Sequence, residues 1–227
     1  MAKAQDAFHL DAGREAAFLG GGLLLNGATI LLPVDADALW SRYKEVDRAS
    51  LPAFDRAAAF RWSPRAHRAS NILFFSALAL GMGGSALAAG GGNVLPPLAI
   101  TTESFLLSAG STGIVKVLVH HPRPFVFDPD APMDLRRSRE AYLSFWSGHV
   151  ANTASLVLSC AALVDRSDAD PGTKAAVWTG GVALPLLMAW LRVRAGRHFP
   201  SDVLVGCVAG ALVGLAVPYF HRPENAR

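Results

Sequence analysis

Charged side chains are scarce in this chain. They make up 17% of the 227 residues, whereas a soluble domain carries about 25%. There are only two cysteines, and the 21 glycines and 14 prolines follow no repeat, which excludes a disulfide scaffold and a collagen-like chain. With 52% hydrophobic residues and a mean hydropathy of +0.30, a disordered chain is excluded as well. A membrane protein or an unusually apolar helical enzyme remains.

The charge balance gives no sign of a nucleic-acid partner. The chain has 21 basic and 18 acidic residues, a net charge of +3. Such a small excess does not produce the field that attracts nucleic acid. We therefore expect no nucleic-acid partner, and the position of the basic residues is more informative than their number.

Six apolar runs decide between the two remaining classes. A helix that crosses a bilayer needs about 20 mostly apolar residues. The runs cover residues 16–34, 72–92, 94–119, 148–164, 175–191 and 203–220. A chain of this size cannot bury six such helices in one core. The sequence therefore predicts an all-α fold, a six-transmembrane-helix bundle that forms one integral membrane domain over residues 1–227.

Small residues in the runs suggest close helix packing. Gly206, Gly210 and Gly214 recur every four residues and would leave one helix face bare, so that another backbone could approach. A scatter of glycine without a packing role stays open as the alternative. Cys160 and Cys207 lie inside the runs, and we expect them to be small buried residues rather than a disulfide.

The long connection after the first run is expected to contain a helix at the membrane surface. Here apolar and aromatic residues alternate with basic ones, a pattern typical of interfacial helices. The apolar set is Leu39, Trp40, Tyr43, Val46, Leu51, Phe54, Phe60 and Trp62, and the basic set is Arg42, Lys44, Arg48, Arg56, Arg61, Arg65 and Arg68. A solvated loop is the alternative.

Polar clusters mark the connections that six spans would bring to one side of the membrane, those after the first, third and fifth runs. Lys116 and Arg123 flank the end of the third run, and Ser147, Gly148 and His149 begin the fourth. The last such connection contributes Arg192, His198 and Asp202. We expect these clusters to converge on one face.

These residue types together could bind and transfer a phosphoryl group. Lys116, Arg123 and Arg192 supply positive charge, and the arginines offer forked donors that match phosphate oxygens. Backbone amides at Ser147 and Gly148 would add donors at a helix N-terminus. The sequence therefore predicts an oxyanion cradle, and phosphoryl transfer further needs a nucleophile and a proton donor.

Two histidines could fill those roles. His198 and Asp202 are four residues apart, so the carboxylate could orient one ring nitrogen and leave the other to attack phosphorus. His149 could then protonate the leaving group and later activate water. The scheme requires neither metal nor cofactor. A zinc site of His120, His121, His149 and His198 is the competing interpretation, but no acidic or cysteine partner is spaced to complete it.

The three clusters resemble the signature of the type 2 phosphatidic acid phosphatase family, relatives of the vanadium-dependent haloperoxidases. The likeness consists of Lys116, six residues and Arg123-Pro124; then Ser147-Gly148-His149; then Arg192, five residues, His198, three residues and Asp202. It covers roughly residues 100–215. Trp146 and Leu191 depart from the pattern, which has Pro and Ser at these positions.

The resemblance implies a phosphoric monoester or diphosphate hydrolase acting on lipids. It assigns His198 as nucleophile, Asp202 as its orienting group and His149 as acid, with Lys116, Arg123, Ser147, Gly148 and Arg192 holding phosphate. The expected reaction is removal of a terminal phosphate from a lipid phosphate or pyrophosphate through a phosphohistidine. A phosphotransferase using the same site, a vanadate-dependent haloperoxidase and a noncatalytic lipid-binding bundle are the alternatives.

Several charged residues have no assigned role at this point. Glu103 lies inside the third run, about 20 Å along a helix from Lys116, and we expect it to form a structural hydrogen bond with a neighbouring helix. Arg136, Arg137 and Arg139 could bind an anionic headgroup or lie in a solvated loop. Arg194 and Arg197 flank His198, so one of them could contact substrate.

The Lys and Arg distribution and the family resemblance predict opposite orientations of the protein in the cell membrane. Of the 21 Lys and Arg residues, 15 lie on the side of the polar clusters and 6 on the side of the termini. The positive-inside tendency would place the clusters in the cytoplasm, whereas members of the family usually face outward. Following the resemblance, we expect a multi-pass cell-membrane protein with an extracytoplasmic site.

Overall fold

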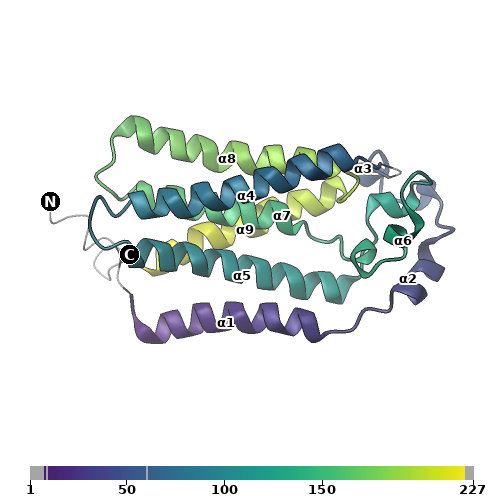
Figure 1. The fold of residues 1–227 in the computed structure, drawn as a ribbon, viewed down its shortest axis with the longest axis horizontal. Helices are drawn as coiled ribbons and strands as arrows, with labels where there is room; N and C mark the ends of the chain where they lie inside the picture. Colours follow the sequence, from purple (N-terminus) through teal and green to yellow (C-terminus); the bar gives the residue numbers. More distant parts are fainter. Residues whose placement is uncertain (1–7, 9, 60, 223–227) are drawn as a thin grey trace.

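The chain folds as a bundle of helices, seen in a computed structural model that describes residues 8, 10–59 and 61–222 (Figure 1). All regular elements in this part of the chain are helical. The long helices are α1 (Ala12–Leu31), α4 (Pro64–Leu87), α5 (Leu95–Val119), α7 (Gly148–Val164), α8 (Pro171–Arg194) and α9 (Pro200–Phe220). The short ones are α2 (Ala36–Tyr43), η1 (Arg48–Ser50), α3 (Ala53–Arg56), η2 (Pro124–Phe127), α6 (Met133–Arg136) and η3 (Arg139–Tyr142). The predicted all-α fold is confirmed.

The long helices form a membrane bundle. By length and composition, α4, α5, α8 and α9 can each cross a bilayer, and α1 meets the same criterion together with α2, from which it is bent by 73°. At 17 residues, α7 is shorter. It packs against α4, α5, α8 and α9 and is buried over most of its length. The structure therefore gives four or five candidate spans where the sequence predicted six, with α7 as the central helix.

Several helices begin before the predicted boundaries. α4 starts at Pro64 rather than near residue 72, because the Ser63 hydroxyl accepts a hydrogen bond from the Ala66 amide and proline suits the first helical position. α8 starts at Pro171 with Asp170 as its cap. The first turns of α4 and α8 contain polar residues, so these turns were not counted in the predicted apolar runs although the helices include them. As a result, the start of α4 belongs to the bundle and contributes to the site described below.

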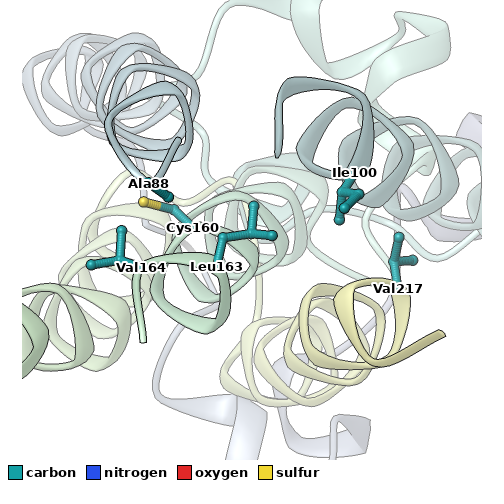
Figure 2. Packing of buried hydrophobic residues seen from close by; sticks show 6 residues of the cluster. All are labelled: Ala88, Ile100, Cys160, Leu163, Val164 and Val217. Carbon is teal, nitrogen blue, oxygen red and sulfur yellow. The ribbon is translucent and has the colours of Figure 1, made fainter. Parts of the chain in front are cut away.

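Glycine allows α9 to lie directly against α7. A Cβ at Gly206 or Gly214 would come within 2.8 or 2.7 Å of the carbonyl oxygen of Ser147 or Ser155, and one at Gly210 would collide with Ala151. The predicted bare face is therefore confirmed. Figure 2 shows apolar packing among α5, α7, α9 and the residue after α4, made by Ala88, Ile100, Cys160, Leu163, Val164 and Val217. Both cysteines are free, as predicted.

The connection between α1 and α4 contains the expected short helices, but their aromatic side chains contact the protein. Leu39, Trp40, Tyr43 and Trp62 pack on a buried cluster that includes Phe125 and Tyr142, and Val46 and Leu51 pack on another that includes Phe127 and Phe199. Phe54 is exposed, and Phe60 lies outside the described residues. The apolar side chains of this connection therefore mainly pack on the segment between α5 and α7 rather than on lipid.

Candidate active site

A cavity of about 480 Å³ is lined by residues at one end of the bundle. This is the end where the short helices α2, α3 and α6 lie (Figure 1). The cavity brings together residues from α4, α5, α7, α8 and the connections between them. The lining residues are His67, Phe74, Lys116, Arg123, Glu140, Gly148, His149, Asn152, Arg192, Arg197 and His198. Six of the eight site residues predicted from sequence are among them. The other two, Ser147 and Asp202, are fully buried and do not line the cavity.

His198 is held by a buried carboxylate. Its Nδ1 lies 3.6 Å from Oδ2 of Asp202 and 3.3 Å from the Ser144 hydroxyl. Asp202 Oδ2 also accepts a hydrogen bond from the Phe199 amide at 2.8 Å and one from the Ser144 hydroxyl. Both side chains are almost fully buried. This arrangement leaves Nε2 of His198 as the nitrogen available to a ligand in the cavity.

The electrostatic environment keeps the His198 ring neutral. Burial lowers the pKa of His198 well below its ordinary value, and the nearby cations Lys116, Arg123 and Arg192 add to this effect, while the hydrogen bond with Asp202 opposes it. A neutral imidazole has a free lone pair. His198 is therefore in the protonation state that a nucleophile needs.

His149 is positioned by residues of α4. Its Nε2 lies 3.1 Å from the Asn71 side-chain oxygen, and its ring packs against Phe74 with 5.0 Å between centroids. Because an amide oxygen only accepts, Nε2 donates this hydrogen bond. Asn71 and Phe74 thus fix the orientation of the ring at the cavity wall.

The cations at the cavity are anchored from the protein side. Lys116 Nζ donates to the carbonyl oxygens of Leu143 and Ser144. Arg123 donates from Nε to the Glu140 carbonyl at 2.7 Å and from Nη2 to its carboxylate at 2.9 Å. Each cation is therefore fixed before an anion arrives, and Glu140 offsets only part of the positive charge.

Arg192 is the most deeply buried of the cations, at 2% exposure. Its Nη1 donates to the Ser70 hydroxyl at 3.0 Å and to His67 Nδ1 at 3.2 Å. Its Nε has no hydrogen-bond partner among the described residues. A buried guanidinium with unused donors at a cavity wall is suited to bind a phosphate oxygen.

The start of α7 contributes backbone donors, although not from Ser147. The Ser147 amide donates to the Asp202 carbonyl at 3.0 Å, and its buried hydroxyl has no partner among the described residues. Gly148, which follows it, lines the cavity as the first residue of α7. The free amides of the first helical turn therefore lie at the cavity from Gly148 onward.

Sequence reasoning missed the residues that support this site. From α4 come His67, Ser70, Asn71 and Phe74, which lie in the stretch treated as a connection or its edge. His121 Nδ1 lies 3.3 Å from Asp202 Oδ1, a second contact on the orienting carboxylate. No motif spacing identifies these residues. The polar side chains near the start of the apolar helix α4 could, however, have indicated that this part of the helix contacts other polar groups.

Asp55 of α3 is another missed residue. Only 6% exposed, it accepts hydrogen bonds from the Ser201 amide at 2.9 Å and the Ser201 hydroxyl at 2.6 Å. Since Ser201 directly precedes Asp202, this contact holds the first turn of α9 beside His198.

The structure gives the unassigned residues clear positions. Arg197 lines the cavity, stacked over Trp62 and Phe125, and burial, then Arg123, lowers its pKa to about 10. Arg194 stacks on Trp190.

The three arginines between α5 and α7 form hydrogen bonds within the protein. Arg136 donates to the Val126 carbonyl, Arg137 to the Asp37 carboxylate and Arg139 to the Thr29 carbonyl. Trp146 donates from Nε1 to Thr112 at 2.7 Å.

The four histidines of the alternative zinc site do not gather. Within the described ranges, a group of three possible metal ligands is found only at the other end of the bundle.

Most of the helical bundle, including the cavity residues from Lys116 onward, matches a known protein family. The family model described as the PAP2 superfamily matches residues 97–226, which include every predicted site residue. The chain belongs to the PAP2 superfamily. At the level of the family it is therefore a membrane phosphatase, and the resemblance seen in the sequence is confirmed.

A solved structure supports the fold. The transmembrane PAP2 type phosphatidylglycerolphosphate phosphatase from Bacillus subtilis aligns with a TM-score of 0.53 and 20% sequence identity, over 91% of this chain and 94% of that one. A search of the curated proteins gives no match. Because the alignment covers 91% of this chain, the structural likeness extends beyond residues 97–226 into the part of the chain that precedes them.

Proposed function

We propose that this PAP2 protein hydrolyses a terminal phosphate from a lipid phosphate or pyrophosphate through a phosphohistidine on His198. The observation that carries the proposal is the single cavity in which His198 and His149 face fixed cations. Its position at the end of a membrane bundle would let the headgroup enter while the chains stay in the bilayer. Phosphatidic acid, phosphatidylglycerol phosphate, polyprenyl pyrophosphate and lipid A phosphate fit this description.

In the first step, Nε2 of His198 attacks phosphorus and the bond between phosphorus and the leaving oxygen breaks. Asp202 stabilises the positive charge that develops on the ring. The leaving oxygen takes a proton from His149. Lys116, Arg123, Arg192 and the amides from Gly148 onward bind the equatorial oxygens, where charge gathers in the transition state.

In the second step, His149 accepts a proton from a water molecule, whose oxygen attacks phosphorus. The bond between Nε2 and phosphorus breaks, inorganic phosphate leaves, and both histidines return to their starting states. A lipid hydroxyl in place of water would make the same site a phosphotransferase.

The direct test is phosphate release by the purified full-length protein in detergent, measured over a panel of lipid phosphates and pyrophosphates. We expect release of inorganic phosphate without any added acceptor. Release only in the presence of an acceptor lipid would identify a transferase instead. Release from none of the lipids, with or without acceptor, would contradict the proposal.

Orthovanadate is expected to inhibit this activity, because it adopts the five-coordinate geometry of the transferred phosphorus and would bind the cations and His198. A chelator should leave the activity within about twofold, because protein cations and imidazoles supply the charge and proton transfers that a metal would otherwise supply. Both effects are measured as initial rates on the best lipid of the panel. Loss of activity in the chelator with recovery on adding magnesium would contradict this scheme.

We also propose that the cavity faces away from the cytoplasm, following the family. The start of α1 and the end of α9 lie at the opposite end of the bundle from the short helices, which are at the end with the cavity (Figure 1). A reporter fused after Arg227 should therefore be cytoplasmic, as measured by paired fusions active only inside or only outside the cytoplasm. An extracytoplasmic reporter would reverse this orientation and agree with the Lys and Arg distribution.

A further inference from the structure

Three ionisable side chains meet at the end of the bundle remote from the phosphate cavity. They are Glu15 of α1, Glu103 of α5 and His221, which directly follows α9. Their ligating atoms all lie within 4.8 Å of one another. Glu103 and His221 are fully buried, and the Glu15 side chain is 15% exposed. The sequence predicted a structural hydrogen bond between Glu103 and a neighbouring helix, whereas the structure places Glu103 Oε2 3.0 Å from His221 Nε2, within a larger cluster of ionisable groups.

The tautomer of His221 makes this cluster unusual. Its Nδ1 lies 2.8 Å from the Val217 carbonyl oxygen, and because a carbonyl only accepts, Nδ1 carries a proton. In the neutral ring Nε2 then presents a lone pair. That nitrogen lies 2.8 Å from Glu15 Oε1 and 3.0 Å from Glu103 Oε2, so three electron-rich atoms face one another.

Three of the four carboxylate oxygens of this cluster lack a hydrogen-bond donor among the described residues. Neither oxygen of Glu103, nor Oε2 of Glu15, accepts a hydrogen bond from any described residue. The fourth, Glu15 Oε1, accepts a hydrogen bond from Arg14 Nε at 3.4 Å, and Arg14 Nη1 donates to the Phe220 carbonyl. An extra proton on His221 Nε2 would point mainly at one carboxylate and leave the remaining oxygens unsatisfied. Buried carboxylate oxygens without donors are costly.

A divalent cation between the three side chains would satisfy them together. One imidazole and two carboxylates are typical zinc ligands, at about 2.0 to 2.2 Å from the metal. A backbone carbonyl that accepts from the other ring nitrogen is the usual outer contact of a metal-bound histidine. We propose that Glu15, Glu103 and His221 bind one zinc-like divalent transition-metal ion. Such an ion would join α1, α5 and the end of α9 and act structurally, far from the phosphate cavity.

The test uses the full-length protein in detergent, stripped with a chelator and then equilibrated with or without Zn²⁺ followed by removal of free metal. Mass spectrometric metal analysis should find about one zinc per chain, and Zn²⁺ should raise the Tm of the stripped protein. The Glu103→Gln and His221→Asn variants should each lose both effects. Asp165→Asn, which removes a carboxylate after α7, should retain them.

Glu103→Gln keeps the shape of the side chain and removes its charge, so it separates metal binding from folding. Its elution volume and helical circular dichroism should match the wild type, and its lipid phosphatase activity should be unchanged. Absence of zinc from the wild type would overturn the proposal in favour of a proton shared among the three groups. Equal zinc content in wild type and Glu103→Gln would also overturn it.

Discussion

The His198→Ala variant is expected to lose about 10⁴-fold or more of the wild-type turnover, because it removes the atom that bonds to phosphorus. His149, the other proposed catalytic histidine, is not free to take over this role because its ring is held by Asn71 and Phe74. The measurement is initial phosphate release from the best lipid. Labelling with ³²P should trap a base-stable, acid-labile phosphoenzyme, as expected for a phosphohistidine, in the wild type and none in the variant.

A matched histidine variant controls for non-specific damage. His120 ends α5 with a positive φ of 50°, a conformation that asparagine tolerates. His120→Asn should therefore retain activity and labelling. If His198→Ala kept more than about a tenth of the wild-type turnover, or if label in the wild type mapped to another residue, the proposed nucleophile would be wrong.

The helical topology explains why so much of the cavity could be predicted from sequence. Lys116, Gly148, His149 and Arg192 lie at the ends of long apolar helices, and consecutive spans bring alternate connections to the same end. The six predicted runs correspond in order to the six long helices, so counting the runs up to each motif was enough to bring the motifs together. The close approach of α9 to α7 was readable for a similar reason, because small residues recur at the period of the helix.

Contacts between distant segments could not be predicted in the same way. Arg192 bonds to Ser70, and His149 to Asn71, but these partners lie in the first turns of α4, where charged neighbours masked the helix. Asp55 reaches Ser201 across 146 positions. A single sequence carries local periodicity, but it contains no spacing rule that pairs residues so far apart.

The first long connection shows the same limit. Its alternation of apolar and basic residues correctly indicated that one side must be covered. The pattern does not encode what covers it, however, and the structure places Trp40 and Tyr43 on the protein cluster around Phe125 and Tyr142. An amphipathic pattern is the same whether the apolar side of the helix packs on the membrane or on the rest of the protein.

His149→Ala should cause the second largest loss, about 10²- to 10⁴-fold in turnover of lipid substrates, the range typical of general acid–base catalysis. With p-nitrophenyl phosphate the leaving group needs little protonation, so the first step should persist. The second step still needs a base to activate water. Rapid mixing should therefore show a burst of about one nitrophenol per enzyme, followed by slow turnover and accumulation of labelled His198.

This burst separates the two histidines, because His198→Ala should show none. Asn71→Ala, which removes only the partner of His149 Nε2, should reduce lipid turnover less than His149→Ala, while leaving the burst intact. Loss of the burst in His149→Ala would mean that this residue chiefly binds phosphate. An equal loss in the rate of the first step for lipid and aryl phosphate, measured by rapid mixing, would lead to the same reassignment, because a general acid matters most where the leaving oxygen is most basic.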